Sequence, residues 1–303
     1  MSNHSRRHTT VFFAPGYNTE AISLETVNKA VHVAASLRNR LIDGVVIKVP
    51  TALTEDDLAL VHDRAYITAV RTGEPGGLAA SGIGRWHRDV FECVTLSNGG
   101  VVAAVLEAMR TGHNAGSLSS GLHHARAGSG AGFCTFNGLA IAARRAAEAG
   151  ATRVLIVDLD AHFGGGTASI IDGDPCIEQI DVSVSQYDWY DDVPNARATL
   201  AEHGRYLETV EEFLAAVADP GSIDVVIYNA GMDPHQYCST GGRRDITTEV
   251  LAAREEMVFS WARSHGVPVA WVLAGGYMSE RLDMDGIVDL HRLTIEASAR
   301  HSA

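Results

Sequence analysis

The chain has 303 residues, of which 46% are hydrophobic and 20% are charged, and its formal net charge at pH 7 is −13. This composition is that of a globular protein long enough to bury a large core, and it excludes collagen-like and low-complexity chains. The acidic balance disfavours direct nucleic-acid binding and attachment to anionic membranes, because both need a basic surface that neutralises phosphate.

Short apolar runs alternate along the chain with longer segments that carry apolar residues at helical spacing. In chain order we expect strands over residues 11–14 and 44–49, then helices over 101–109 and 139–149. A strand over 154–157, a helix over 207–217, a strand over 225–228, a helix over 248–262 and a strand over 267–273 follow. This alternation predicts βαβ units around a mostly parallel sheet, which is an α/β fold. Because no linker rich in Pro, Ser or charge divides the chain, we expect one domain over residues 1–303.

The N-terminal segment and the cysteines indicate the compartment. The first apolar run, residues 11–14, is too short for a signal sequence or a membrane span. The four cysteines lack any C-x-x-C spacing, so neither a disulfide framework nor a cysteine zinc site is indicated. We therefore expect reduced thiols and a cytoplasmic location.

Polar residues follow three of the expected strands. Asp158, Asp160 and His162 follow strand 154–157, and Asp233 follows strand 225–228. The string Gly275-Gly276-Tyr277 follows the last strand. Because open α/β sheets bind their ligands beyond the carboxyl ends of the strands, one site could collect all three groups.

The first of these strings predicts a metal site. In an extended chain Asp158, Asp160 and His162 point to the same face, and carboxylates side by side in an apolar interior are costly unless a cation or hydrogen bonds compensate them. Capping of a helix or of loop amides is the alternative, and Asp233 at a second strand end weakens it. Asp160, His162 and Asp233 suit one zinc ion with an open position, although iron or cobalt would accept the same ligands.

A two-manganese site of the arginase type is the competing interpretation. Such a site needs a further Asp two residues beyond the His, where this chain has Gly164. It also needs a second D-x-D at a later strand end, where this chain offers only Asp233. We therefore expect a single metal ion.

Two adjacent histidines lie upstream, and together with the later motifs they carry a family resemblance. Taken alone, His123 and His124 could be surface or structural residues, although flanking glycines allow close approach to a ligand. From about Leu58 onward the chain resembles the zinc-dependent histone deacetylases of the arginase and deacetylase superfamily. The resemblance rests on four ordered motifs: Gly121-Leu122-His123-His124, Gly132-Phe133-Cys134, Asp158-Leu159-Asp160-Ala161-His162 and Gly275-Gly276-Tyr277. Within that family, residues 226–233 are most similar to the class IV enzymes.

The resemblance implies a role for each site residue. Asp160, His162 and Asp233 would bind the zinc. His124 would act as general base and then general acid, and His123 as its electrostatic partner. Tyr277 would donate its hydroxyl to the substrate carbonyl and the oxyanion.

The resemblance also implies a fold and a substrate class. The fold would be a three-layer αβα sandwich of the arginase/deacetylase type. Gly132 and Phe133 would line a narrow tunnel for an acylated amine: an acyl-lysine in a protein, an acetylated polyamine or a small acylated metabolite. Asp158 would lie behind His123 and help to hold a structural K⁺ or Na⁺.

Two positions depart from the family pattern, and both lie on the loop 163–166. Gly165 stands where the family usually has an Asp or Asn that hydrogen-bonds the second histidine, and Phe163 replaces a polar residue. Without that partner, we expect the protein to have lower activity or an altered pH profile, or His124 to have a substitute partner from elsewhere in the chain. Gly165→Asp would then shift the pH–rate profile.

Three functions are consistent with these features. The leading one is a zinc-dependent amidohydrolase that removes an acyl group from an amine. The second is an impaired deacetylase-fold protein that binds acyl amines without efficient turnover because of Gly165. The third is a metallohydrolase of the same superfamily acting on a guanidine or amidine, which the missing ligands of a second metal disfavour.

Overall fold

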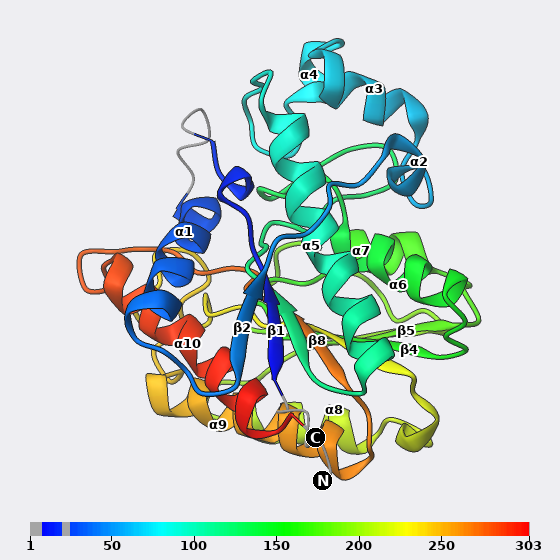
Figure 1. Ribbon diagram of the computed structural model, residues 1–303. Coiled ribbons are helices and arrows are strands. Elements are labelled where there is room, and N and C mark those ends of the chain that lie inside the picture. Colours follow the sequence, from blue (N-terminus) through cyan, green and yellow to red (C-terminus); the bar gives the residue numbers. More distant parts are fainter. Residues whose placement is uncertain (1–7, 20–24, 303) are drawn as a thin grey trace, which may run out of the picture.

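The computed structural model describes residues 8–19 and 25–302. Eight strands form one sheet in which every paired neighbour runs parallel, in the order β2-β1-β3-β8-β7-β4-β5-β6 (Figure 1). The strands are β1 (Thr9–Phe12), β2 (Val45–Lys48), β3 (Ala115–Ser117), β4 (Val154–Asp158), β5 (Ile177–Ser183), β6 (Ala196–Leu200), β7 (Val225–Asn229) and β8 (Val269–Val272).

Ten α-helices accompany the sheet within these residues. They are α1 (Glu25–Asn39), α2 (Glu55–Leu58), α3 (Arg64–Thr72), α4 (Gly76–Ala79), α5 (Val90–Thr111), α6 (Gly138–Glu148), α7 (Gly165–Ile171), α8 (Tyr206–Ala215), α9 (Thr248–Ser264) and α10 (Met284–Arg300), with 3₁₀ turns at Pro15–Tyr17 and Pro220–Ser222. One group packs together in the order α1, α10, α9, α8, and the other in the order α3, α5, α6, α7. The two groups cover opposite faces of the sheet (Figure 1), so the chain has the expected three-layer αβα architecture.

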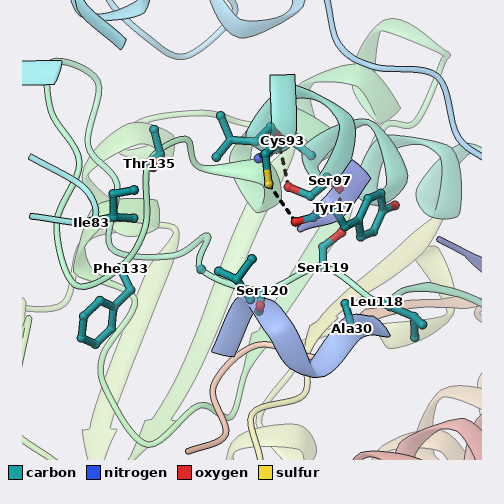
Figure 2. Close-up of a pocket in the computed structure, with 14 residues that line it drawn as sticks. Tyr17, Ala30, Ile83, Cys93, Ser97, Leu118, Ser119, Ser120, Phe133 and Thr135 are labelled. Atoms are coloured by element: carbon teal, nitrogen blue, oxygen red, sulfur yellow. Dashed lines mark hydrogen bonds between the residues drawn. The ribbon is translucent and has the colours of Figure 1, made fainter. Parts of the chain in front are cut away.

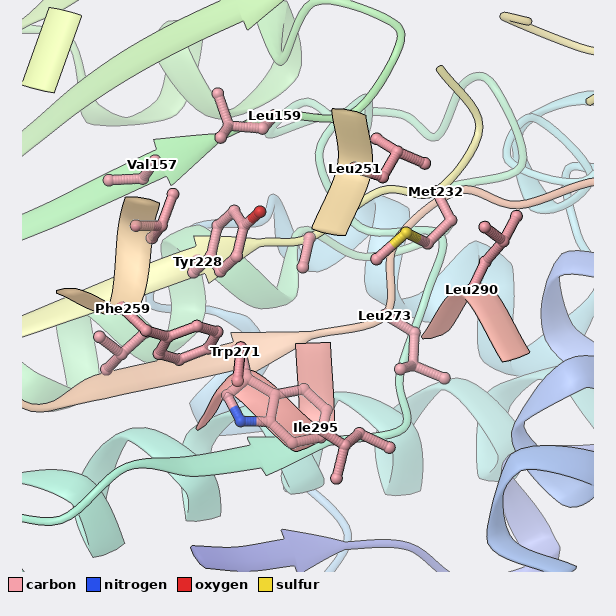
Figure 3. Close-up of a cluster of buried hydrophobic side chains, with 14 of the residues drawn as sticks. Val157, Leu159, Tyr228, Met232, Leu251, Phe259, Trp271, Leu273, Leu290 and Ile295 are labelled. Atoms are coloured by element: carbon pink, nitrogen blue, oxygen red, sulfur yellow. The ribbon is translucent and has the colours of Figure 1, made fainter. Parts of the chain in front are cut away.

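The central strands are buried on both faces, as parallel sheets between two helical layers are. Every residue of β4, β7 and β8 is buried. On the face of α9 and α10, Tyr228 and Phe259 pack with ring centroids 5.9 Å apart, and Trp271 lies beside them (Figure 3). The indole nitrogen of Trp271 donates to Ser298 Oγ at 2.8 Å, which satisfies the one polar atom of this fully buried side chain.

Helix α5 is the one helix of the described residues that is long and apolar enough to cross a membrane. Its apolar composition has a different explanation in this fold, because it packs against α6 and against strands β1, β3 and β8. Most of its apolar window is buried inside the protein, 61% by residue, as in the core helix of a globular protein.

The elements expected from the sequence are all present, and most ends differ by one or two residues. The exception is the helix expected over 101–109, which begins eleven residues earlier, at Val90. The five expected strands correspond to β1, β2, β4, β7 and β8, and the four helical segments to α5, α6, α8 and α9. Strand β3 was not expected, because its three residues Ala115–Ser117 are small and form no apolar run. The expectation of one domain stays a prediction.

Candidate active site

Four neighbouring strands deliver the site residues to one edge of the sheet. Strands β3, β8, β7 and β4 lie side by side and end at Ser117, Val272, Asn229 and Asp158. The sequence indicated the last three of these ends, and the structure adds β3, which leads into His123 and His124. The site therefore lies at the carboxyl ends of the central strands.

Asp160, His162 and Asp233 form a buried cluster whose ligand atoms all lie within 4.8 Å of one another. Nδ1 of His162 lies 3.1 Å from Asp160 Oδ1 and 3.2 Å from Asp233 Oδ2. Backbone amides hold the other carboxylate oxygens: Gly275 donates to Asp160 Oδ2 at 2.8 Å and Ala161 to Asp233 Oδ1 at 3.0 Å.

The alternation expected for Asp158, Asp160 and His162 is wrong, because β4 ends at Asp158. Two successive aspartate turns shape this segment instead: the amide of Asp160 donates to Asp158 Oδ1, and the amide of His162 donates to Asp160 Oδ1. Asp158 consequently lies outside the cluster and faces His123.

This cluster fits a divalent metal ion. Asp233 Oδ2 is buried and accepts no hydrogen bond among the described residues, although His162 Nδ1 lies 3.2 Å away. A buried carboxylate oxygen in this position is costly unless a cation compensates it. Burial and the nearby charge of Asp160 raise the pKa of Asp233 to about 6, the mark of two carboxylates that share one site. Two carboxylates and an imidazole are suitable zinc ligands.

Arg254 of α9 ties together the two loops that carry the carboxylates. Its side chain is fully buried, and Nη1 donates to the backbone oxygens of Leu159 at 3.0 Å and Gly231 at 2.8 Å. Glu255 balances its charge at 2.6 Å. Since Leu159 and Gly231 lie one and two residues before Asp160 and Asp233, Arg254 holds the cluster together from behind.

His123 forms a buried charge pair with Asp158. Its Nδ1 donates to Asp158 Oδ2 at 2.8 Å, and its Nε2 lies 3.5 Å from Asp160 Oδ1. Burial lowers the pKa of His123, but Asp158 and Asp160 outweigh burial and raise this pKa to about 10. Asp158 Oδ1 accepts from Asn229 at 2.8 Å. The structural K⁺ or Na⁺ expected beside Asp158 stays a prediction.

His124 has a carboxylate partner that the sequence did not reveal. Its Nδ1 donates to Asp188 Oδ2 at 2.9 Å, and Asp188 Oδ1 forms an ion pair with Arg126. Burial and the charge of His123 lower the pKa of His124 to about 4, against the opposing effect of Asp188. Of the three consequences expected from Gly165, the structure therefore shows a substitute partner.

Phe163, the second departure from the family pattern, packs under the same loop. Its ring is fully buried and lies against Trp189, with centroids 4.8 Å apart, and against Tyr190 at 6.3 Å. These two aromatics anchor the loop that carries Asp188.

A pocket of about 290 Å³ opens above the cluster. Its lining combines aromatic rings with the second histidine and the histidine ligand: His124, Gly132, Phe133, His162, Ser185, Tyr187, Thr240 and Tyr277. The rings of Phe133 and Tyr277 lie 6.1 Å apart, and Tyr187 packs edge-on to His124 at 4.9 Å. Gly132 is required at its place, because a Cβ atom there would overlap the His124 ring.

Two small cavities lie deeper. One, of about 10 Å³, is bordered by His123, His124, Asp160 and Tyr277. The other, of about 30 Å³, shares Gly121 with it and has a wall of hydroxyls and a thiol (Figure 2). There the Cys93 thiol donates to the backbone oxygen of Tyr17 at 2.8 Å. This second cavity is large enough for about two water molecules.

Several other residues have structural roles. Cys134 is buried beside the site, and burial raises the pKa of its thiol well above the usual value, so it is a poor nucleophile. His235 is also buried, and its Nε2 hydrogen-bonds Thr248 Oγ1 at 3.1 Å. Trp86 donates to the backbone of Val70 at 2.7 Å.

Sequence reasoning missed Asp188, Arg126 and Arg254. Asp188 stands 64 positions from His124, and no spacing rule joins the two. The available signal was indirect: position 165 lacks the carboxylate usual in the family, and an acid stands between two aromatic residues, Tyr187 and Trp189. Arg254 gave no signal, because an arginine in a helical segment is ordinarily solvated.

The chain is similar to known proteins in both sequence and fold. A sequence model of the histone deacetylase domain matches residues 23–285. An uncharacterized protein of Picosynechococcus is 34% identical over 233 residues, covering 75% of this chain and 77% of its own. A probable deacetylase of Methanothermobacter thermautotrophicus is 29% identical over 261 residues, covering 78% and 76% respectively. The crystal structure of the HDA15 HD domain has a TM-score of 0.78 at 20% identity, covering 96% of this chain and 89% of that one, so the fold is shared.

Proposed function

This chain belongs to the histone deacetylase family, and from that premise we propose that it is a zinc-dependent amidohydrolase that removes an acyl group from an amine. One observation carries the proposal. The pocket is bordered by His124, His162 and Tyr277, and the small cavity by His123, His124, Asp160 and Tyr277. Asp233 completes the buried cluster with Asp160 and His162.

Asp160, His162 and Asp233 are the residues that would hold the metal. Zinc bound there would polarise the acyl carbonyl as a Lewis acid and make a water molecule more acidic. Three protein ligands leave a position open, which is the arrangement of catalytic zinc sites.

The histidines and the tyrosine would supply the remaining chemistry. His124, whose low pKa leaves Nε2 free to accept, would take the proton as water attacks the carbonyl carbon. The same histidine would return that proton to the nitrogen as the C–N bond breaks, so that a carboxylic acid and an amine leave. Tyr277 would donate to the oxyanion, and the charged His123–Asp158 pair would stabilise it electrostatically.

The pocket wall supports an extended substrate with an apolar stem. Phe133 is 38% exposed and Tyr187 is 49% exposed, so both present ring surface to the pocket mouth. Such a wall would exclude water from an acyl-lysine, an acetylated polyamine or a small acylated metabolite. The net charge of −13 is compatible with a cationic amine. We keep the cytoplasmic location as part of this proposal.

The alternative of an impaired binding protein rested on the missing carboxylate at Gly165. Because Asp188 supplies a carboxylate to His124 at 2.9 Å, that reason for impairment is removed. The enzyme is therefore the better supported of the two functions.

The proposal is tested with purified protein of measured zinc content. Acetyl-lysine peptides, acetylated polyamines and longer acyl amides are offered to the wild type and to Tyr277→Phe, and the released carboxylic acid is measured. We expect hydrolysis of at least one class, with kcat lower by ~10²–10³-fold in the variant, as for loss of an oxyanion donor. A zinc-loaded wild type that hydrolyses none of them would refute the proposal.

A further inference from the structure

We propose that Asp188, held by Arg126, is the positioning residue that orients His124, and that it has taken over this task from position 165. The inference rests on the proposed function, since it concerns the general base of that reaction. Its physical basis does not depend on activity, because the contacts are those of the folded chain.

The Asp188 carboxylate is held on both oxygens. Oδ2 accepts from His124 Nδ1 at 2.9 Å and from the backbone amide of Gly166 at 3.1 Å. Oδ1 pairs with Nη2 of Arg126, whose Nη1 donates to the backbone oxygen of Gly165 at 2.8 Å. The side chain is only 9% exposed. A carboxylate fixed by these additional donors cannot rotate away from the histidine without losing them.

A side chain at position 165 and the observed position of Asp188 are mutually exclusive. A Cβ atom on Gly165 would overlap the backbone oxygen of Asp188 and lie 2.8 Å from its Oδ1. A carboxylate on residue 165 therefore cannot coexist with Asp188 in its present place. The absence of a side chain at position 165 is what allows the substitute to reach His124.

The loop that carries Asp188 is fastened at three neighbouring residues. The amide of Phe163 donates to the backbone oxygen of Tyr187 at 3.1 Å, and the Phe163 ring packs on Trp189. Gln179 donates to Tyr190 Oη at 2.8 Å. Asp188 itself has a φ of 60°, a left-handed conformation that aspartate tolerates better than most residues. Phe163 thus anchors the loop that carries Asp188, and Gly165 leaves room for it.

The consequence for His124 is a defined tautomer. Its Nδ1 carries the proton that Asp188 accepts, so Nε2 is left as the acceptor. The His124 ring borders both the pocket and the small cavity that Asp160 and Tyr277 share. Asp188 therefore acts on the reaction through His124 and does not itself contact substrate.

The experiment uses the zinc-loaded 303-residue chain with ¹⁵N-labelled histidine. Asp188→Ala removes the carboxylate, and the double variant Gly165→Asp with Asp188→Gly returns it to position 165. The glycine frees the backbone at position 188 to turn its oxygen away, which the Cβ atom of residue 165 requires. Asp191→Ala, which removes a neighbouring exposed acid, is the matched control. The measurements are kcat, KM, zinc content and the Nδ1 proton resonance of His124, assigned with His124→Gln.

We expect Asp188→Ala to lower kcat by ~10–100-fold with KM and zinc content nearly unchanged, and to abolish the Nδ1 proton resonance. The double variant should recover both, and Asp191→Ala should behave as the wild type. If Asp188→Ala does not fold, Asp188→Asn replaces it, with an upfield shift of the resonance and a smaller loss of kcat expected.

Wild-type kcat and an unchanged resonance in the Asp188 variant would overturn the proposal. A folded, zinc-loaded double variant that recovers neither would overturn the exchange between positions 165 and 188. If the wild type hydrolyses no acyl amine, the proposed function fails, and the resonance alone decides whether Asp188 orients His124.

Discussion

Asp188 lies directly against Gly165, so that a Cβ atom on Gly165 would overlap the backbone oxygen of Asp188. The shift of the pH–rate profile expected for Gly165→Asp assumed that His124 had no carboxylate partner. The bond from His124 to Asp188 removes that assumption. A second carboxylate added at position 165 would displace the first.

Gly165→Asp alone should therefore damage the site. The overpacking should lower the free energy of unfolding by about 1–3 kcal/mol, and displacement of Asp188 should lower kcat. Urea unfolding and steady-state kinetics, compared with the double variant that also carries Asp188→Gly, check this. If Gly165→Asp had the same free energy of unfolding as the wild type, the overlap between residues 165 and 188 would be contradicted.

Phe163→Gln places a polar residue of the kind usual in the family under the loop of Asp188. Since Phe163 is fully buried among Trp189 and Tyr190, the amide would lose its hydration, and we expect a loss of about 2–4 kcal/mol in unfolding free energy. Phe163→Leu, which keeps the site apolar, should lose less. Equal stability of the two variants in urea would count against this explanation.

Arg254→Met should weaken both the fold and the metal site. The change leaves Glu255 buried without its cation and frees the backbone oxygens of Leu159 and Gly231, which typically costs about 3–5 kcal/mol. Zinc affinity should fall as well, measured by competition with a chelator. Arg263→Met on the exposed side of the same helix is the control, and a variant of Arg254 no worse than this control would refute the role.

His62 should make the fold sensitive to mild acid. It donates from Nδ1 to the Arg126 backbone at 3.0 Å and accepts at Nε2 from the Asn137 amide at 2.9 Å, and burial lowers its pKa from 6.5 to about 4. A group whose folded pKa is depressed in this way favours the neutral form, so its contribution is full above pH 6.5 and is lost as the pH falls towards 4.

Protonation of His62 should remove up to about 3 kcal/mol across that window. The non-titrating His62→Gln provides the reference, and the difference in unfolding free energy between wild type and variant should shrink by that amount between neutral and acidic pH. Two parallel stability curves would show that His62 does not titrate with folding.

The sequence was sufficient for the residues whose positions follow from local patterns. Asp160, His162 and Asp233 each stand just beyond a run of apolar strand residues, and parallel strands bring such positions to one edge. The same alternation predicted four of the helices, α5, α6, α8 and α9, that cover the two faces of the sheet. The reason offered for Asp158, Asp160 and His162 was nevertheless wrong, because aspartate turns and not strand alternation arrange them.

The residues that the sequence did not predict depend on contacts between distant segments. Asp188 reaches His124 only because its loop takes a left-handed turn and Gly165 leaves room. Arg254 lies 95 positions from Leu159, and nothing in its helix distinguishes it from a solvated arginine. Strand β3 escaped detection because three small residues carry no periodicity.

The most direct test of the account is a zinc titration of metal-free protein with release of the carboxylic acid as the readout, using the acyl amine that the wild type hydrolyses best. We predict no turnover without metal, a rise that saturates at one zinc per chain, and no recovery in Asp160→Ala. Turnover that persists without metal, or that survives the loss of Asp160, would contradict the central claim.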